Sequence, residues 1–293
     1  MHGPATGRLR EARRGFPSAQ WFGISREVTV AELLDALWCN YASATPQAAR
    51  IHRLLTERGE QPRNDSVALC TFALASLGGP AAIGVDALAR PFEALGWRPR
   101  DRYRTRDRQL RARYWQHDDP AMPKVVIAEV VVEELSGEAQ AAIAALVGSV
   151  PPGFGARGEL PSAGRPWSVT HATYRALLTE SEHAAHLAAF GFGAHHFTVD
   201  VGSLSTFPDL EALDAFLIEH GERLDDRGGA IKGSRAEWLE RSATRPDLVA
   251  VEFSDATVRV PTGTYEFARR YRLPSGELFH GFVPAIADRF LSI

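Results

Sequence analysis

The chain lacks a long apolar run, a cysteine framework and a strong net charge of either sign. No run of about 18 apolar residues occurs in its 293 residues, so the sequence predicts no membrane-spanning helix. The two cysteines, Cys39 and Cys70, are too few for a disulfide framework and form no CxxC pair, which favours buried thiols in a reducing cytoplasm. A formal net charge of −3 offers no basic field for nucleic acid. Residues 1–20 contain no apolar segment typical of a secretory signal, and we expect them to form a flexible tail.

The remaining sequence is ordinary globular material, in which helical and strand patterns alternate. In the first half the patterns predict helices over Val28–Tyr41, from Pro46 onward and over about Val85–Leu95, and strands over Asn64–Phe72 and Lys124–Glu134.

The second half repeats this order of helix, strand, helix and strands. The predicted helices are His171–Phe190 and Asp209–His220, and the predicted strands are His195–Val201, Val249–Phe253, Thr264–Tyr271 and Leu278–Val283. Residues 151–164, rich in proline and glycine, form the clearest linker. We therefore expect a single α+β domain over residues 21–293, built of two halves at about 21–150 and 165–293.

Eight short motifs follow one another in a fixed order over most of the chain. They are LW-x-NY-x3-TPQA at Leu37–Ala48, ND-x2-AL-x-TF at Asn64–Phe72, LARPFEALGW at Leu88–Trp97, the strand Pro123–Glu129, HFTVDV at His196–Val201, GGAIKGS at Gly228–Ser234, YEFARRY at Tyr265–Tyr271 and GF-x4-AD at Gly281–Asp288. Each motif alone is weak, but the ordered series resembles the 2-oxoadipate dioxygenase/decarboxylase family, whose members are also described as 2-hydroxyglutarate synthases.

This resemblance implies a vicinal-oxygen-chelate-like fold, in which two halves curl their sheets into a barrel around a metal and added helices lie outside. It also implies oxidative decarboxylation and hydroxylation of a small 2-oxo carboxylic acid, 2-oxoadipate, to 2-hydroxyglutarate. The implied cofactor is a non-haem Fe(II) held by two histidines and one carboxylate. Three protein ligands on one face of the ion leave positions for the 2-oxo acid and O2.

The resemblance places two of the metal ligands on residues of this chain. The histidine of the family's HFTV strand matches His196, and the carboxylate of its YEFA strand matches Glu266. We expect these two residues to be the catalytic and metal-binding pair.

The first strand departs from the family pattern Asp-His-x-Ala-x-Arg-Thr-Phe at two positions. Ser66 stands where the family has its first histidine ligand, and Cys70 stands where the family has the arginine that grips the substrate carboxylate. A serine hydroxyl does not offer the nitrogen lone pair with which imidazole binds a metal. A thiol cannot form the two parallel hydrogen bonds that a guanidinium donates to a carboxylate. Because these positions are four apart on one strand face, both losses fall in the same predicted cavity.

Other residues could compensate for these losses. Arg241, which stands where the family usually has a polar neutral residue, could grip a carboxylate or occupy the place of the metal, and Arg270 shares the Glu266 face of its strand. The predicted substrate-binding residues are thus Ser66, Cys70, Arg241 and Arg270.

Three further histidines could rebuild a metal site. His183 and His186 share one helix face, whereas strict alternation directs His195 away from the face of His196.

The sequence leaves three functional hypotheses open. The first is a divergent Fe(II)-dependent dioxygenase/decarboxylase acting on a small 2-oxo or 2-hydroxy acid. The second is a metal-free relative that binds a small acid, or performs acid/base chemistry, in the same cavity. The third is an interaction subunit without a ligand.

Overall fold

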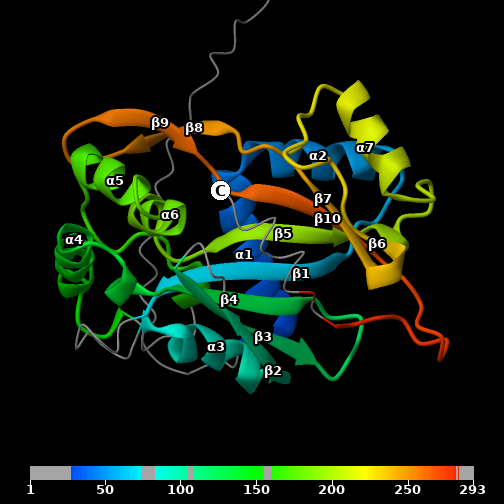
Figure 1. The fold of residues 1–293 in the computed structure, drawn as a ribbon, viewed down its shortest axis with the longest axis horizontal. Coiled ribbons are helices and arrows are strands. Elements are labelled where there is room, and N and C mark those ends of the chain that lie inside the picture. The colour runs from blue at the N-terminus through cyan, green and yellow to red at the C-terminus, as the bar shows by residue number, and fades with distance from the viewer. Residues whose placement is uncertain (1–27, 74–82, 105–108, 155–159, 282, 284–293) are drawn as a thin grey trace, which may run out of the picture.

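The computed structural model describes residues 28–73, 83–104, 109–154, 160–281 and 283 (Figure 1). The expected tail at residues 1–20 lies outside the described residues, as does most of the last motif after Gly281. Within these described ranges, no helix combines the length and the apolar character needed to cross a bilayer.

A mixed eight-stranded sheet forms the centre of the molecule, in the order β2-β3-β4-β1-β5-β10-β7-β6 (Figure 1). Its strands are β1 (Asn64–Phe72), β2 (Trp97–Arg104), β3 (Leu110–His117), β4 (Lys124–Val130), β5 (Ala194–Asp200), β6 (Lys232–Ser234), β7 (Leu239–Ala243) and β10 (Thr264–Arg270). The two halves meet where β1 and β5 pair antiparallel, and each of these strands has a parallel partner on its other side, β4 and β10 respectively.

Each half contributes the same unit. The first runs β1-α3-β2-β3-β4 and the second β5-α7-β6-β7-β10, and in both units the last strand lies parallel to the first. The second unit carries an inserted hairpin, β8 (Leu248–Glu252) and β9 (Thr257–Pro261), between β7 and β10. This repeated, curled arrangement confirms the expected α+β, vicinal-oxygen-chelate-like fold of two halves with added helices.

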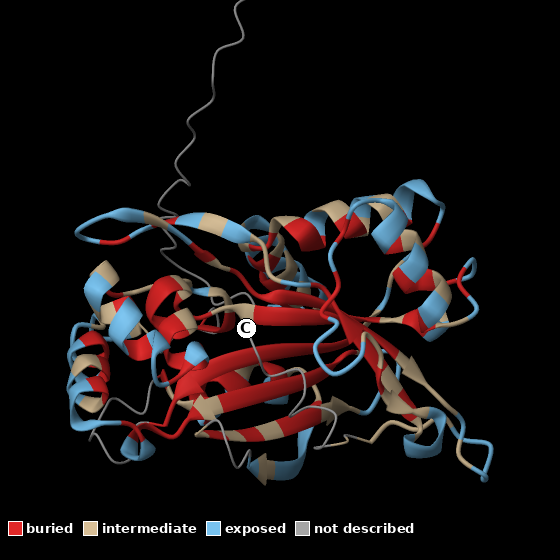
Figure 2. Ribbon diagram, turned by 45° about the horizontal axis from the view of Figure 1, so that its top comes forward, coloured by how far each residue is buried: buried red, intermediate tan, exposed pale blue. Residues whose placement is uncertain are grey.

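Helices cover the convex face of the sheet, where odd-numbered side chains of β5 and β10 point. They are α1 (Val30–Ala44), α2 (Pro46–Glu57), α3 (Val85–Ala94) and α7 (Leu210–Glu219). The ring centroid of Phe197 lies 5.1 Å from that of Tyr41 and 5.3 Å from that of Trp38, and both of these residues are on α1. The central strands are buried throughout (Figure 2), so the even-numbered side chains on the opposite, concave face are also shielded from solvent.

The prediction of one continuous helix over His171–Phe190 is wrong. This segment is divided into α5 (His171–Leu178) and α6 (Glu182–Phe190), because the Ser181 side chain accepts a hydrogen bond from the Ala184 amide and starts a new helix. The strand expected at Leu278–Val283 is reduced, in its described part, to one bridge between Arg272 and Leu278. The remaining helix, α4 (Gly137–Gly148), follows a short 3-10 turn that ends the β4 segment.

Candidate functional site

Two parallel strands bring His196 and Glu266 together on the concave face. Thr264 lies opposite His196 and Glu266 lies opposite Thr198 in the β5–β10 register, so all four side chains share one face. His196 Nδ1 is 3.5 Å from Glu266 Oε1, and Thr264 Oγ1 is 3.5 Å from the same oxygen. Glu266 has no solvent exposure, whereas His196 retains 9%. The predicted pair is thus adjacent and buried, and only the histidine retains a small exposed area.

Arg241 completes this group from the neighbouring strand β7. It lies opposite Ala268 in the antiparallel β7–β10 register, which directs its side chain onto the concave face. Its guanidinium donates to Glu266 Oε2 and to Thr198 Oγ1 at 3.1 Å, and the Thr198 hydroxyl donates to Glu266 Oε2 at 3.2 Å. A buried ion pair whose oxygens accept several hydrogen bonds is strongly held.

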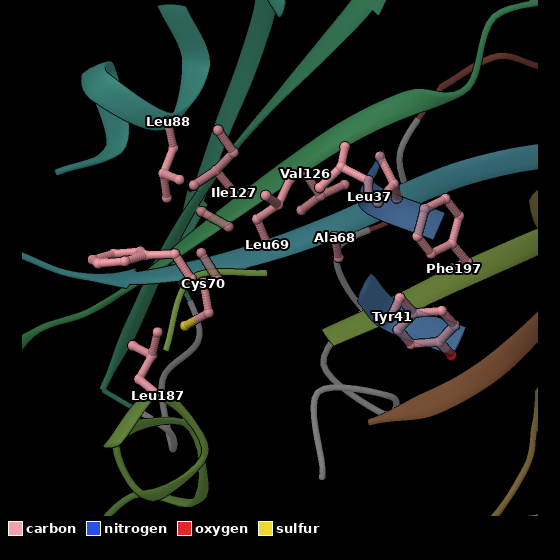
Figure 3. Packing of buried hydrophobic residues seen from close by; sticks show 14 of the residues in the cluster. Leu37, Tyr41, Ala68, Leu69, Cys70, Leu88, Val126, Ile127, Leu187 and Phe197 are labelled. Atoms are coloured by element: carbon pink, nitrogen blue, oxygen red, sulfur yellow. The ribbon is translucent and has the colours of Figure 1, made fainter. Parts of the chain in front are cut away.

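Ser66 and Cys70 have different surroundings although they share a strand face. Ser66 pairs with Thr198 across the β1–β5 ladder, which places it beside the Arg241–Glu266 group. Cys70 is packed in the hydrophobic core and points toward Leu187 of α6 (Figure 3). Burial raises the pKa of the Cys70 thiol far above its usual range, so this side chain stays neutral. The structure therefore brings Ser66, but not Cys70, to the site.

Arg270 is engaged with other protein groups on the same face. It makes a bidentate pair with Asp65, with Nη2 3.0 Å from Oδ2, and its Nη1 donates to the carbonyl oxygens of Phe279 and Gly281 at 3.1 and 2.8 Å. Lys124 Nζ lies 3.5 Å from Asp65 Oδ1. Burial alone would raise the pKa of Asp65, but Arg270 and Lys124 outweigh it and hold that pKa well below its ordinary value. Arg270 thus links strands and a loop rather than pointing to a vacant anion site.

The expected orientation of His195 is wrong. The ladder pairs Ala68 with His196 and Leu69 with Ala194, so His195 is the extra residue of a β-bulge. A bulge breaks the alternation of side chains, and the His195 and His196 rings stack with their centroids 4.5 Å apart. Burial pushes the pKa of His195 well below its ordinary value, and neither of its ring nitrogens has a hydrogen-bond partner among the described residues.

Helix α6 adds two more imidazoles to this neighbourhood. The ring of His183 lies 5.8 Å, and that of His186 6.3 Å, from the His195 ring. His186 also borders a cavity of about 290 Å³ between α1, α6 and the start of β5, which none of the predicted site residues lines. Burial lowers the pKa of His186 to about 4, so its imidazole is neutral at physiological pH.

The protonation state of His196 follows from its position. Burial lowers its pKa, Glu266 raises it and Arg241 lowers it again, and the result is about 4. His196 is therefore neutral near pH 7. If its Nδ1 donates toward Glu266, the other ring nitrogen is left as a proton acceptor.

The residues present do not fit the Fe(II) centre that the resemblance implies. Ser66 supplies no imidazole at the third ligand position, and the carboxylate of Glu266 is engaged by Arg241, Thr198 and His196. Across the described ranges, no group of three or more His, Cys, Asp and Glu side chains is arranged to hold a metal ion.

Sequence reasoning missed three polar residues of this face. Thr198 and Thr264 lie two positions from His196 and Glu266 respectively, so strand alternation could have identified both. Asp65 gave no such signal, because the β1–β5 register shifts between Asn64 and Ser66 and alternation fails there.

Comparison with known proteins finds relatives of this chain, although no protein-family model matches it. It is 29% identical over 225 residues to the chloroplastic 2-oxoadipate dioxygenase/decarboxylase of Arabidopsis thaliana, covering 72% of this chain and 59% of that protein. It is 27% identical over 249 residues to the chloroplastic/amyloplastic counterpart of rice, covering 80% and 67%. The chain thus spans about three fifths of the Arabidopsis relative.

Solved structures agree with the fold. A protein from Shewanella frigidimarina, described provisionally as a hydrolase, is 40% identical with a TM-score of 0.81, covering 87% of this chain and 98% of that one. The rice hydroxyglutarate synthase in complex with 2-oxoadipate is 25% identical with a TM-score of 0.80, covering 88% and 89%. A glyoxalase-superfamily protein from Ralstonia eutropha, at 21% identity and a TM-score of 0.68, shares the fold over 86% and 84% of the two chains.

Proposed function

We propose that this chain is an enzyme that acts on a small 2-oxo or 2-hydroxy carboxylic acid at the concave face of its sheet. The similarity to 2-oxoadipate dioxygenase/decarboxylases supports the substrate class. The observation that carries the proposal is the His196–Glu266 pair, which lies on this face at the positions that match the family's motifs.

The charges on this face suit an acidic substrate. Three cationic side chains, Arg241, Lys124 and Arg270, surround the two carboxylates Glu266 and Asp65. Asp200, whose pKa burial raises above its ordinary value, adds a third carboxylate nearby. These guanidinium and ammonium groups offer positive charge to an anionic substrate in a region of low dielectric constant.

In this proposal His196 is the catalytic residue and Glu266 is a positioning residue. Glu266 is fully buried, so it acts through the imidazole rather than on the substrate. A neutral His196, oriented through Nδ1, accepts a proton from the carbon or hydroxyl beside the substrate carbonyl through its other nitrogen.

Fe(II)-dependent oxygenation of the same acid by O2 is the second candidate. The observation that favours it is that a histidine and a glutamate, two of the ligand types of a facial triad, lie within 3.5 Å of each other. This oxygenase chemistry requires a third metal ligand, and the hydroxyl of Ser66 is a poor substitute for the imidazole that the family has at this position.

A single set of variants tests the proposal. Binding of 2-oxoadipate and of shorter 2-oxo acids is measured calorimetrically with the full chain, and turnover is followed by proton exchange and by oxygen consumption, with added Fe(II) and with chelator. We expect His196→Asn to reduce turnover at least 100-fold, and His220→Asn, which changes an exposed histidine at the end of α7, to leave it unchanged.

The two candidates give opposite results in this assay. Turnover that persists with chelator and consumes no oxygen supports acid/base chemistry, whereas oxygen consumption that requires Fe(II) supports the oxygenase. Failure of the folded wild-type protein to bind any of these acids would contradict both.

A further inference from the structure

The place beside Glu266 is taken by a permanent cation of the protein itself. The Arg241 guanidinium contacts one carboxylate oxygen, Oε2, while His196 and Thr264 lie beside the other. The side chain of Arg241 is 10% exposed and that of Glu266 is fully buried. A guanidinium cannot lose its proton in a protein, so this positive charge is present at every accessible pH.

A metal ion and this guanidinium would compete for the same carboxylate. A divalent cation bound by His196 and Glu266 would lie next to Arg241 in a region of low dielectric constant, where like charges repel strongly. Thr198 strengthens the existing arrangement, because its hydroxyl accepts from Arg241 and donates to Glu266. The hydrogen bonds among Arg241, Thr198 and Glu266 therefore hold this carboxylate without an added ion.

The residue at the third ligand position agrees with this arrangement. Ser66 lies opposite Thr198 on the adjacent strand, so it borders the same cluster. An imidazole there would help to bind a metal, whereas a short neutral hydroxyl leaves room for the guanidinium. The loss of a ligand at Ser66 and the gain of a cation at Arg241 thus have one physical explanation.

We propose that Arg241 replaces the metal ion in this site, so that its guanidinium neutralises Glu266 and excludes a divalent cation. The protein then holds His196 and Glu266 in place without iron. This inference rests on the proposed function only in treating the concave face as the active site.

Rebuilding the metal site tests the inference. The full chain is prepared as wild type, Ser66→His, Arg241→Gln and Ser66→His/Arg241→Gln, incubated anaerobically with Fe(II) or with Co(II), desalted and analysed for metal by mass spectrometry. Co(II) bound by nitrogen and oxygen ligands also gives a visible absorption spectrum. Thermal unfolding establishes that each variant is folded.

We expect less than about a tenth of a metal ion per chain in wild type and in Ser66→His, and close to one in the double variant. Arg53→Gln, which changes an arginine with a 67% exposed side chain on α2, serves as the control and should match wild type. Stoichiometric metal in wild type that is lost in Glu266→Gln would overturn the inference. It would also be overturned if Ser66→His bound as much metal as the double variant, or if the folded double variant bound none.

The outcome is separable from that of the proposed function, because no substrate is present in the metal measurements. Expected metal contents together with no binding of 2-oxo acids would refute the proposed function alone. Acid binding by a stoichiometrically metal-loaded wild type would refute the inference alone.

Discussion

The effect of a buried carboxylate on the stability of this chain depends on which groups donate hydrogen bonds or positive charge to it. Glu266 is fully buried and accepts from Arg241 and Thr198, so its charge is balanced within hydrogen-bonding distance. Asp214 on α7 is also buried, but its Oδ1 accepts only the Ser242 hydroxyl, at 2.7 Å, and its Oδ2 has no hydrogen-bond partner among the described residues. The Glu266 carboxylate is thus compensated as an ion, whereas an ionised Asp214 carboxylate destabilises the folded state at neutral pH.

Asp214→Asn should therefore stabilise the protein at neutral pH. Burial raises the pKa of Asp214 from 3.8 to about 6, so the folded state binds a proton that the unfolded state has released, and stability falls as pH rises between these values. The shift corresponds to at most about 3 kcal/mol. We expect the free energy of unfolding of the variant to exceed that of wild type by about 1–3 kcal/mol at pH 8 and to equal it near pH 4, as measured by urea denaturation. A difference independent of pH would contradict this.

At the scale of elements, the β5 bulge that carries His195 and His196 is held by a close approach of β10. A Cβ built on Gly263 would lie 1.8 Å from the His195 carbonyl oxygen, so only glycine fits at this position. The glycine precedes β10 by one residue and thereby fixes how Glu266 is placed against His196.

Gly263→Ala is expected to disturb both stability and the site. The added methyl group must displace the bulge, which costs about 1–3 kcal/mol as other overpacking substitutions do. Because the bulge carries His196, turnover should fall as well. Gly137→Ala on α4, where a Cβ would meet nothing within 4 Å, is the matched control and should be neutral or slightly stabilising. Chemical denaturation and turnover of the two variants check this, and equal behaviour would show that the bulge is not constrained by Gly263.

The elements that the sequence predicted were those with a strong local signal. Pro46 opens α2, and the pattern over Asn64–Phe72 matches β1 from end to end. The division of the helix at Ser181 could have been found from its capping residue. The His195 bulge could not, because it depends on how β1 and β5 pair across more than a hundred residues.

Several residues of the candidate site could be named from the sequence, but their contacts could not. The resemblance identified His196, Glu266 and Arg241, and strand alternation could add Thr198. The contact of Arg241 with Glu266 requires the β7–β10 register, and the β8–β9 hairpin inserted between these strands hides it from sequence inspection. Strand alternation also predicted Arg270 as a substrate-binding residue. In the structure its guanidinium pairs with Asp65, which the β1–β5 bulge directs toward it.

At the scale of the whole molecule, the two halves are joined by more than the β1–β5 ladder. Asp65 belongs to β1 of the first half and Arg270 to β10 of the second, and their bidentate pair crosses the concave face between them. Arg270 also binds the carbonyl oxygens of Phe279 and Gly281, while Gln116 of β3 donates to the His280 carbonyl at 2.7 Å. One guanidinium thus fastens the segment after β10 across both halves of the sheet.

Arg270→Gln should loosen this connection and weaken the fold in a pH-dependent manner. Removing one partner of a buried ion pair costs about 3–5 kcal/mol, because the Asp65 carboxylate is left buried with only Lys124 beside it. In wild type the pKa of Asp65 is held below its ordinary value. The Asp65–Arg270 pair therefore stabilises the protein at every pH above the ordinary pKa of an aspartate, and this stabilisation is lost on strong acidification. The difference between variant and wild type should accordingly be largest near neutral pH and shrink as the pH falls, because the variant can then protonate Asp65.

Hydrogen exchange followed by mass spectrometry checks the structural part of this prediction. Backbone amides of residues 271–281 should exchange faster in Arg270→Gln, while those of the α1–α2 pair on the convex face should change less. Arg269→Gln is the matched control, since it alters the neighbouring arginine whose side chain alternates to the other face of β10. Unchanged exchange at residues 271–281 in the Arg270 variant would mean that the segment is held over the concave face by its apolar contacts, such as Phe279 against Leu239 and Ala268, and not by the guanidinium.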